Sequence, residues 1–142
     1  MIRIARRLLR AVEDHARQAW PEEACGLLIG ECRGAETLIV AAEKTANIAV
    51  DRAHRFEIDP ARHIALQRGL RGTERAVVGV YHSHPDGSAE PSTTDAALAL
   101  DPDLVWLIVS LRNGELGGSK AFSLMAGGGT FANVPIEIED ET

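Results

Sequence analysis

The run "LVWLIVSL" at residues 104–111 constrains the fold more than any other part of the chain. It is apolar at every position but one, and a run of this length and composition is typical of a buried β-strand. It continues into "RNGE", where the Asn113-Gly114 pair favours a tight hairpin turn because both residues accept positive φ angles. The chain is therefore expected to fold around a β-sheet that contains this hairpin.

Hydrophobic spacing elsewhere predicts helices beside the sheet. Residues 3–19 have the pattern of an amphipathic helix, in which Ile4, Leu8 and Val12 share the spacing of a core stripe. A second helix is expected over residues 61–72, where the helical spacing ends at a glycine. These patterns predict one helix that precedes the strands of the sheet and one that stands between two of them in the sequence.

Further segments have strand character. The apolar runs at 23–32 and 35–46 are expected to form an antiparallel pair, since turn residues around Gly34 separate them. Another strand is predicted at 76–84, a short helix at 91–100, and strands broken by a Gly-rich loop at 116–138. Few of these connections are helical, which favours antiparallel pairing.

Length and composition indicate one α/β domain. The 142 residues, 45% of them hydrophobic, are enough for one core, and no internal repeat or linker is evident. We therefore predict a single domain over residues 1–142, with a mixed, largely antiparallel sheet flanked by helices.

Charge and cysteine content exclude several classes of protein. A net charge of −6 without a recurring Lys/Arg block argues against a nucleic-acid partner. No apolar run approaches the ~20 residues of a membrane span. Cys25 and Cys32 are separated by an odd number of positions, so one strand would place them on opposite faces and a disulfide is not expected. Two unpaired thiols fit a reducing cytoplasm.

The segment "VYHSHPDGSAEPSTTD", residues 80–95, has metal-binding character. In a strand, His82 and His84 project to the same side with Cα atoms ~6.6 Å apart, so both imidazoles can reach one ion. A catalytic zinc site keeps three protein ligands and one open position. Asp95 is the best candidate for the third ligand, because the turning loop before it can return its carboxylate to the strand end. The set predicts one zinc ion per chain.

Each part of this pattern also has a simpler interpretation. The sequence "STTD" alone is most often a capping box, with Ser92 as N-cap and Asp95 at the third helical position. The two histidines alone are more often polar surface or hydrogen-bonded core groups. The combination of both parts favours the metal site.

A hydrolase that uses zinc also needs a general base for the water that the metal activates. Glu22 and Glu23 stand at the entry to an apolar strand, where a buried carboxylate is costly without a partner. Exposure at a helix end is the simpler interpretation for both. Strand alternation alone does not choose between them.

With these residues identified, the chain resembles the JAMM (MPN+) zinc metalloproteases. "HSHP" at 82–85, "STTD" at 92–95 and the ten residues between His84 and Asp95 match the signature of that family. The family glutamate precedes a glycine by three positions, as in "EACG", which selects Glu23. The resemblance covers most of the chain and implies the JAMM/MPN fold, which is cytidine-deaminase-like.

The resemblance also implies chemistry. His82, His84 and Asp95 would hold Zn²⁺, Glu23 would transfer the proton, and Ser92 would stabilise the oxyanion. The compact chain looks like prokaryotic members, some of which cleave after the C-terminal Gly-Gly of ubiquitin-fold, sulfur-carrier proteins. Two alternatives remain: a RadC-like protein, which has asparagine where Ser83 stands, and a zinc-bearing scaffold that binds a ubiquitin-fold partner without turnover.

The remaining histidines have no partners at metal-binding spacing. We expect them to occupy surface or helix positions without a part in the site. They are His15, His54 and His63.

Overall fold

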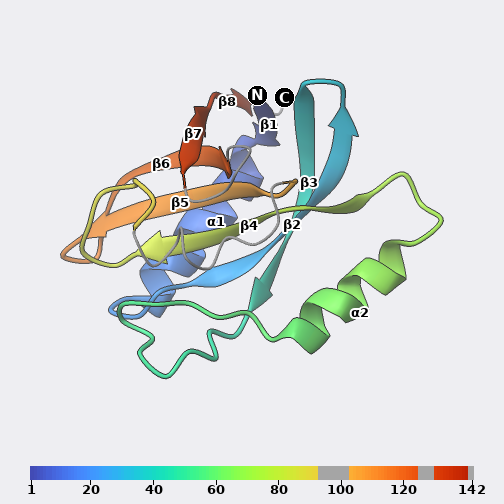
Figure 1. The fold of residues 1–142 in the computed structure, drawn as a ribbon. Helices are drawn as coiled ribbons and strands as arrows, with labels where there is room; N and C mark the ends of the chain where they lie inside the picture. Colours follow the sequence, from blue (N-terminus) through green and yellow to red (C-terminus); the bar gives the residue numbers. More distant parts are fainter. Residues whose placement is uncertain (93–102, 125–129, 141–142) are drawn as a thin grey trace.

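The computed structural model describes residues 1–92, 103–124 and 130–140. These residues form an eight-stranded sheet and two helices (Figure 1). In chain order the elements are β1 (Ile2–Ala5), α1 (Arg6–Ala19), β2 (Cys25–Arg33), β3 (Glu36–Thr45), α2 (Pro60–Leu70), β4 (Ala76–His84), β5 (Val105–Arg112), β6 (Glu115–Leu124), β7 (Phe131–Val134) and β8 (Ile136–Glu139).

The sheet is mixed, as the sequence predicted, with the strand order β7-β6-β5-β4-β2-β3-β1-β8. Neighbours are antiparallel in the pairs β2/β3, β2/β4, β5/β6 and β6/β7. They are parallel in the pairs β1/β3, β1/β8 and β4/β5. The parallel pair at the centre places the carboxyl end of β4, which carries both histidines of the motif, beside β5.

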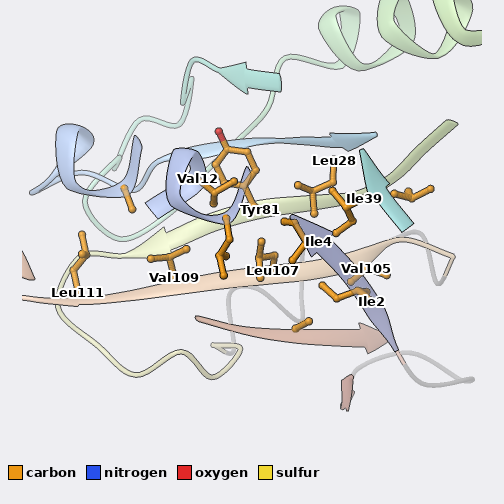
Figure 2. Close-up of a cluster of buried hydrophobic side chains, with 14 residues drawn as sticks. Ile2, Ile4, Val12, Leu28, Ile39, Tyr81, Val105, Leu107, Val109 and Leu111 are labelled. Atoms are coloured by element: carbon orange, nitrogen blue, oxygen red, sulfur yellow. The ribbon is translucent and has the colours of Figure 1, made fainter. Parts of the chain in front are cut away.

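A separate apolar cluster covers each face of the sheet. On one face, α1 packs through Leu9, Val12 and Ala16 onto side chains from β1 to β5 (Figures 1 and 2). The second cluster includes Phe56 and Trp106 and is joined by Leu66 of α2. The β4 histidine His82 contacts this second cluster, so the site lies on the face opposite α1.

The predicted helix over residues 3–19 is wrong at its beginning. Ile2–Ala5 is the strand β1, and the helix begins only at Arg6. Ile2 and Ile4 are fully buried because β1 is inserted between β3 and β8, while Arg3 pairs with Glu137 of β8 at 2.9 Å. Strand pairing with segments distant in sequence therefore overrides a helical pattern that would have extended without interruption.

Other predicted elements are confirmed with small shifts. The β5/β6 hairpin turns at Asn113 and Gly114, which have φ angles of 53° and 79°. Helix α2 begins at Pro60, one residue early, because the Asp59 side chain accepts a hydrogen bond from the Ala61 amide at 3.0 Å. The short helix predicted at 91–100 falls largely outside the described residues. Neither helix of the described chain combines the length and apolar character needed to span a bilayer.

Candidate active site

The end of strand β4 brings two imidazole rings together. The Nε2 atoms of His82 and His84 lie 3.2 Å apart. The His82 side chain is completely buried, whereas His84 is partly exposed. The predicted same-side projection of the two residues is therefore what the strand produces.

Neighbouring groups orient both rings. The Nδ1 atom of His84 donates a hydrogen bond to the Ser88 carbonyl oxygen at 2.7 Å, which leaves its Nε2 atom as a lone-pair donor. The His82 ring stacks on Phe56 with a centroid distance of 4.4 Å and an interplanar angle of 17°. Trp106 meets the same ring edge to face at 5.5 Å. His82 is therefore held between aromatic rings of two other segments.

The spacing of these nitrogens suits one shared ion. Two nitrogens bound at ~2.0 to 2.1 Å to a tetrahedral zinc ion stand roughly 3.3 Å apart, close to the distance observed. Asp95, the predicted third ligand, lies outside the described residues. Within residues 1–92, 103–124 and 130–140, no three His, Cys, Asp or Glu side chains form a metal-binding group.

Strand pairing carries Glu23 to the same place. The residue after it, Ala24, donates its amide to the Ser83 Oγ atom at 2.8 Å and accepts the Ser83 amide at 3.0 Å. Ser83 stands between the two histidines in β4, so these hydrogen bonds place Glu23 next to the end of the strand that carries both. Glu23 is buried, with only 5% of the residue exposed. In contrast, the side chain of Glu22 is 45% exposed and forms an ion pair with Arg52 at 2.8 Å.

A cavity of about 530 Å³ joins these residues. Glu23 and His84 line it, and the exposed residue Ser92 lies on its wall. The remaining lining residues come from the turn before β2, the loop after β3 and the loop after β4: Pro21, Ala53, His54, Pro85, Asp86, Gly87, Ser88, Glu90 and Pro91. The cavity therefore brings three predicted site residues together from distant parts of the sequence.

His54, for which the sequence predicts no part in the site, also lines the cavity. Asp51 holds the Nδ1 atom of His54 at 2.9 Å. The expectation that His54 is a surface residue is correct for its exposure, but its position belongs to the site. No spacing rule identifies it, because it stands on a long loop whose path depends on tertiary contacts. A D-x-x-H pair at 51–54 is the only local signal.

Cys25, adjacent to the site in sequence, is completely buried. Burial raises the pKa of its thiol, a hydrogen bond with Thr45 opposes this rise, and the Glu23 carboxylate adds to it. The Sγ atom lies 3.4 Å from the Thr45 Oγ1 atom, and the lining of the cavity does not include Cys25. The thiol therefore stays protonated and serves packing. Cys25 and Cys32 are both free, as predicted.

Comparison with known proteins identifies relatives along most of the chain. The family described as prokaryotic homologs of the JAB domain matches residues 5–124. A desampylase of Haloferax volcanii is 34% identical over 104 residues, which cover 70% of this chain and 73% of the relative. A CysO-cysteine peptidase of Mycobacterium bovis is 29% identical over 124 residues, which cover 84% and 80%.

A solved structure has the same fold along nearly the whole chain. The solution structure of a protein from Desulfitobacterium hafniense superposes with a TM-score of 0.85 and 31% identity, and the match covers 99% of this chain and 94% of that chain. The family match, over residues 5–124, spans the elements from α1 to β6 and the described residues that line the cavity. The chain therefore belongs to the prokaryotic JAB/MPN family, which confirms the resemblance to the JAMM (MPN+) proteins.

Proposed function

We propose that this protein is a zinc-dependent peptidase or isopeptidase that hydrolyses the bond after the C-terminal Gly-Gly of a ubiquitin-fold, sulfur-carrier-like protein. The observation that carries the proposal is the 3.2 Å separation of two imidazole nitrogens beside a buried glutamate. The relatives support the reaction type, since one is a desampylase and another is a CysO-cysteine peptidase.

The donor atoms of the site suit zinc. His82 and His84 supply two nitrogens, and Asp95 would supply a carboxylate oxygen, a set that zinc accepts and that calcium and magnesium disfavour. When bound, zinc would lower the pKa of a water molecule and polarise the scissile carbonyl. The hydrogen bond from His84 to Ser88 fixes the tautomer that this role requires.

Glu23 is the proposed general base. Its carboxylate would accept a proton from the attacking water while the water oxygen forms a bond to the scissile carbonyl carbon. The same carboxyl group would then return this proton to the leaving nitrogen as the C–N bond breaks. The products are the Gly-Gly carboxylate and a free amine, and Glu23 ends in its starting state. Ser92 lines the same cavity and would donate its hydroxyl to the developing oxyanion.

A tail that ends in Gly-Gly fits this site for steric reasons. The tail has no side chains at the cleavage point, so it can approach the cavity wall in an extended form and pair its backbone with the protein. Pro21 and most residues of the Pro85 to Pro91 loop line the cavity. A narrow groove at this place would select the tail for its lack of side chains, and the folded body of the partner would remain outside.

A cleavage assay tests the proposal. A ubiquitin-fold protein extended by a short peptide after its Gly-Gly is incubated with the enzyme, with and without a chelator, and the products are weighed by mass spectrometry. We expect cleavage after the second glycine, loss of activity with the chelator and recovery with zinc. Glu23→Gln should bind zinc and lose ~10²- to 10⁴-fold in kcat.

Glu22→Gln is the matched control, because it removes a neighbouring carboxylate that is exposed. It should retain wild-type kcat. Equal activity of Glu23→Gln and wild type would refute the assignment of the base. Chelator-insensitive cleavage would refute the assignment of zinc.

A further inference from the structure

We infer that Asn47 is a positioning residue for the active site, which fixes the general base Glu23 and the Phe56 ring behind His82 in one rigid unit. The inference rests on the proposed function for its kinetic part. Asn47 stands in the loop that joins β3 to α2, at residues 46–59, and its side chain does not line the cavity. It therefore acts through other residues.

The Asn47 side-chain amide forms hydrogen bonds with backbone groups along this loop and with Glu23 outside it. Its Nδ2 atom donates to the Glu23 carbonyl oxygen at 3.0 Å and to the Arg55 carbonyl oxygen at 2.9 Å. Its Oδ1 atom accepts from the Ala49 amide at 3.1 Å and from the Glu57 amide at 3.0 Å. A longer contact of 3.5 Å joins Nδ2 to the Arg52 carbonyl oxygen. The amide thus connects the start of the loop, its end and the base.

The backbone of Glu23 is held by this loop at both of its polar groups. Its carbonyl oxygen accepts from Asn47, and its amide donates to the Arg52 carbonyl oxygen at 2.7 Å. On the following residue, Ala24 is bound to Ser83 of β4. The base is therefore fixed between the histidine strand and a loop that the Asn47 side chain closes together with the hydrogen bond from the Ile48 amide to the Glu57 carbonyl oxygen at 3.0 Å.

The same amide holds the residues on both sides of Phe56. The Arg55 carbonyl oxygen accepts from the Asn47 side chain and the Glu57 amide donates to it, which restrains the position of the residue between them. Phe56 is 7% exposed and stacks on the His82 ring at 4.4 Å. Asn47 therefore connects the segment that carries Phe56, whose ring stacks on His82, to the main chain of Glu23.

Asparagine suits this place because its amide combines two N–H donors with an oxygen that accepts two hydrogen bonds. Aspartate keeps the acceptor oxygen but has no donor for the carbonyl groups of Glu23 and Arg55. Alanine has neither. The two substitutions separate the donor function from the acceptor function.

Hydrogen exchange in metal-free protein tests the positioning directly. We expect Asn47→Ala to accelerate exchange of the Glu23, Ala49 and Glu57 amides by roughly tenfold each, while amides of the β5/β6 ladder stay unchanged. The Glu23 amide is informative because it does not contact Asn47. In Asn47→Asp, the Ala49 and Glu57 amides should stay protected and the Glu23 amide should exchange faster.

Kinetics on zinc-loaded protein separates positioning from stability. We expect kcat per bound zinc to fall by about 100-fold in Asn47→Ala, with KM unchanged, since a displacement of the base near 1 Å costs about this much. The matched control is Asn133→Ala, an exposed asparagine on β7, which should match wild type in kcat and in exchange. If Asn47→Ala does not fold, Asn47→Asp serves in both measurements.

Two results would overturn the inference. One is a lower melting temperature of the Asn47 variants with wild-type kcat per bound zinc, which would make Asn47 a residue of stability alone. The other is an unchanged exchange rate of the Glu23 amide. Failure of the proposed function is distinguishable, because wild-type protein would then cleave no substrate while the exchange experiment would still decide the role of Asn47.

Discussion

The Nε2 atoms of His82 and His84 lie 3.2 Å apart, with one ring fully buried against Phe56 and the other bound through Nδ1 to the Ser88 carbonyl. Each ring is orientated by a different neighbour, and under the proposed function this separation would let both Nε2 atoms reach one ion with little rearrangement.

We predict one zinc ion per chain, lost on substitution of any ligand. His82→Ala, His84→Ala and Asp95→Ala should each purify without zinc and take up none on titration, because two remaining ligands do not hold the ion. His63→Ala, which removes a histidine of α2, should bind as wild type does. Metal analysis by mass spectrometry measures the stoichiometry. Wild-type affinity in any of the first three variants would show that the ligand set is wrong.

Ser92 can serve catalysis or only a helix start, and one substitution separates the two. If its hydroxyl meets the oxyanion, Ser92→Ala should lower kcat by ~10²- to 10³-fold at unchanged zinc content. Loss of a cap alone would cost ~1 kcal/mol of stability and leave kcat of the folded protein unchanged. Melting temperature, zinc content and kcat are measured on the same preparation. We expect the catalytic result.

The glycines of the substrate should be essential for its cleavage. Replacing the penultimate glycine of the tail by leucine or phenylalanine is expected to abolish turnover, because a side chain at that point would collide with the cavity wall. The same replacement several residues upstream is the control and should be tolerated. Cleavage rates by mass spectrometry decide it. Equal cleavage of bulky and native tails would refute a narrow site.

Gly26 leaves no room for a side chain, so Gly26→Ala should destabilise the fold. A Cβ atom there would overlap the ring of Tyr81 and lie 2.5 Å from the Glu43 carbonyl oxygen. The ring cannot withdraw freely, since the Tyr81 hydroxyl is bound to His15 at 2.7 Å. We expect a loss of about 1 to 3 kcal/mol in denaturant unfolding.

Gly69→Ala is the matched control for this experiment. Gly69 lies in α2, and an added Cβ atom would meet nothing within 4 Å. Replacement of a helical glycine by alanine should raise stability by about 0.5 to 1 kcal/mol. If Gly26→Ala were as stable as Gly69→Ala, the close contact with Tyr81 would be unimportant for the fold.

His15 should make the fold less stable in acid. Burial lowers the pKa of His15, and the charge of Lys44 lowers it further. The unfolded chain, with a histidine pKa of about 6.5, therefore binds a proton that the folded protein resists. The contribution of neutral His15 to the free energy of unfolding is fully present above about pH 6.5, and it declines as the pH falls toward the lower pKa of the folded state. His15→Gln should flatten this decline in urea unfolding at pH 5 to 8, and parallel curves for both proteins would contradict the assignment.

Several features of the molecule were predictable because they depend on neighbours in sequence. Strand alternation placed His82 and His84 on one side of β4, and the tolerance of Asn113 and Gly114 for positive φ angles determined the β5/β6 turn. The resemblance selected Glu23 from its spacing to Gly26, and the structure then buried Glu23 and exposed Glu22. His82 and His84 are two positions apart on one strand, so their relative placement follows from strand alternation.

Contacts between distant segments decided the remaining features. Ile2–Ala5 is a strand because β3 and β8 offer their edges to it, which no local pattern reveals. Asn47 reaches Glu23, and His54 reaches the cavity, because the loop after β3 folds back on the start of β2. The sequence by itself determined which chemical groups are present and which way a strand turns them. Only the tertiary structure determined which loop holds them, since side-chain hydrogen bonds across more than 20 residues depend on the path of the whole chain.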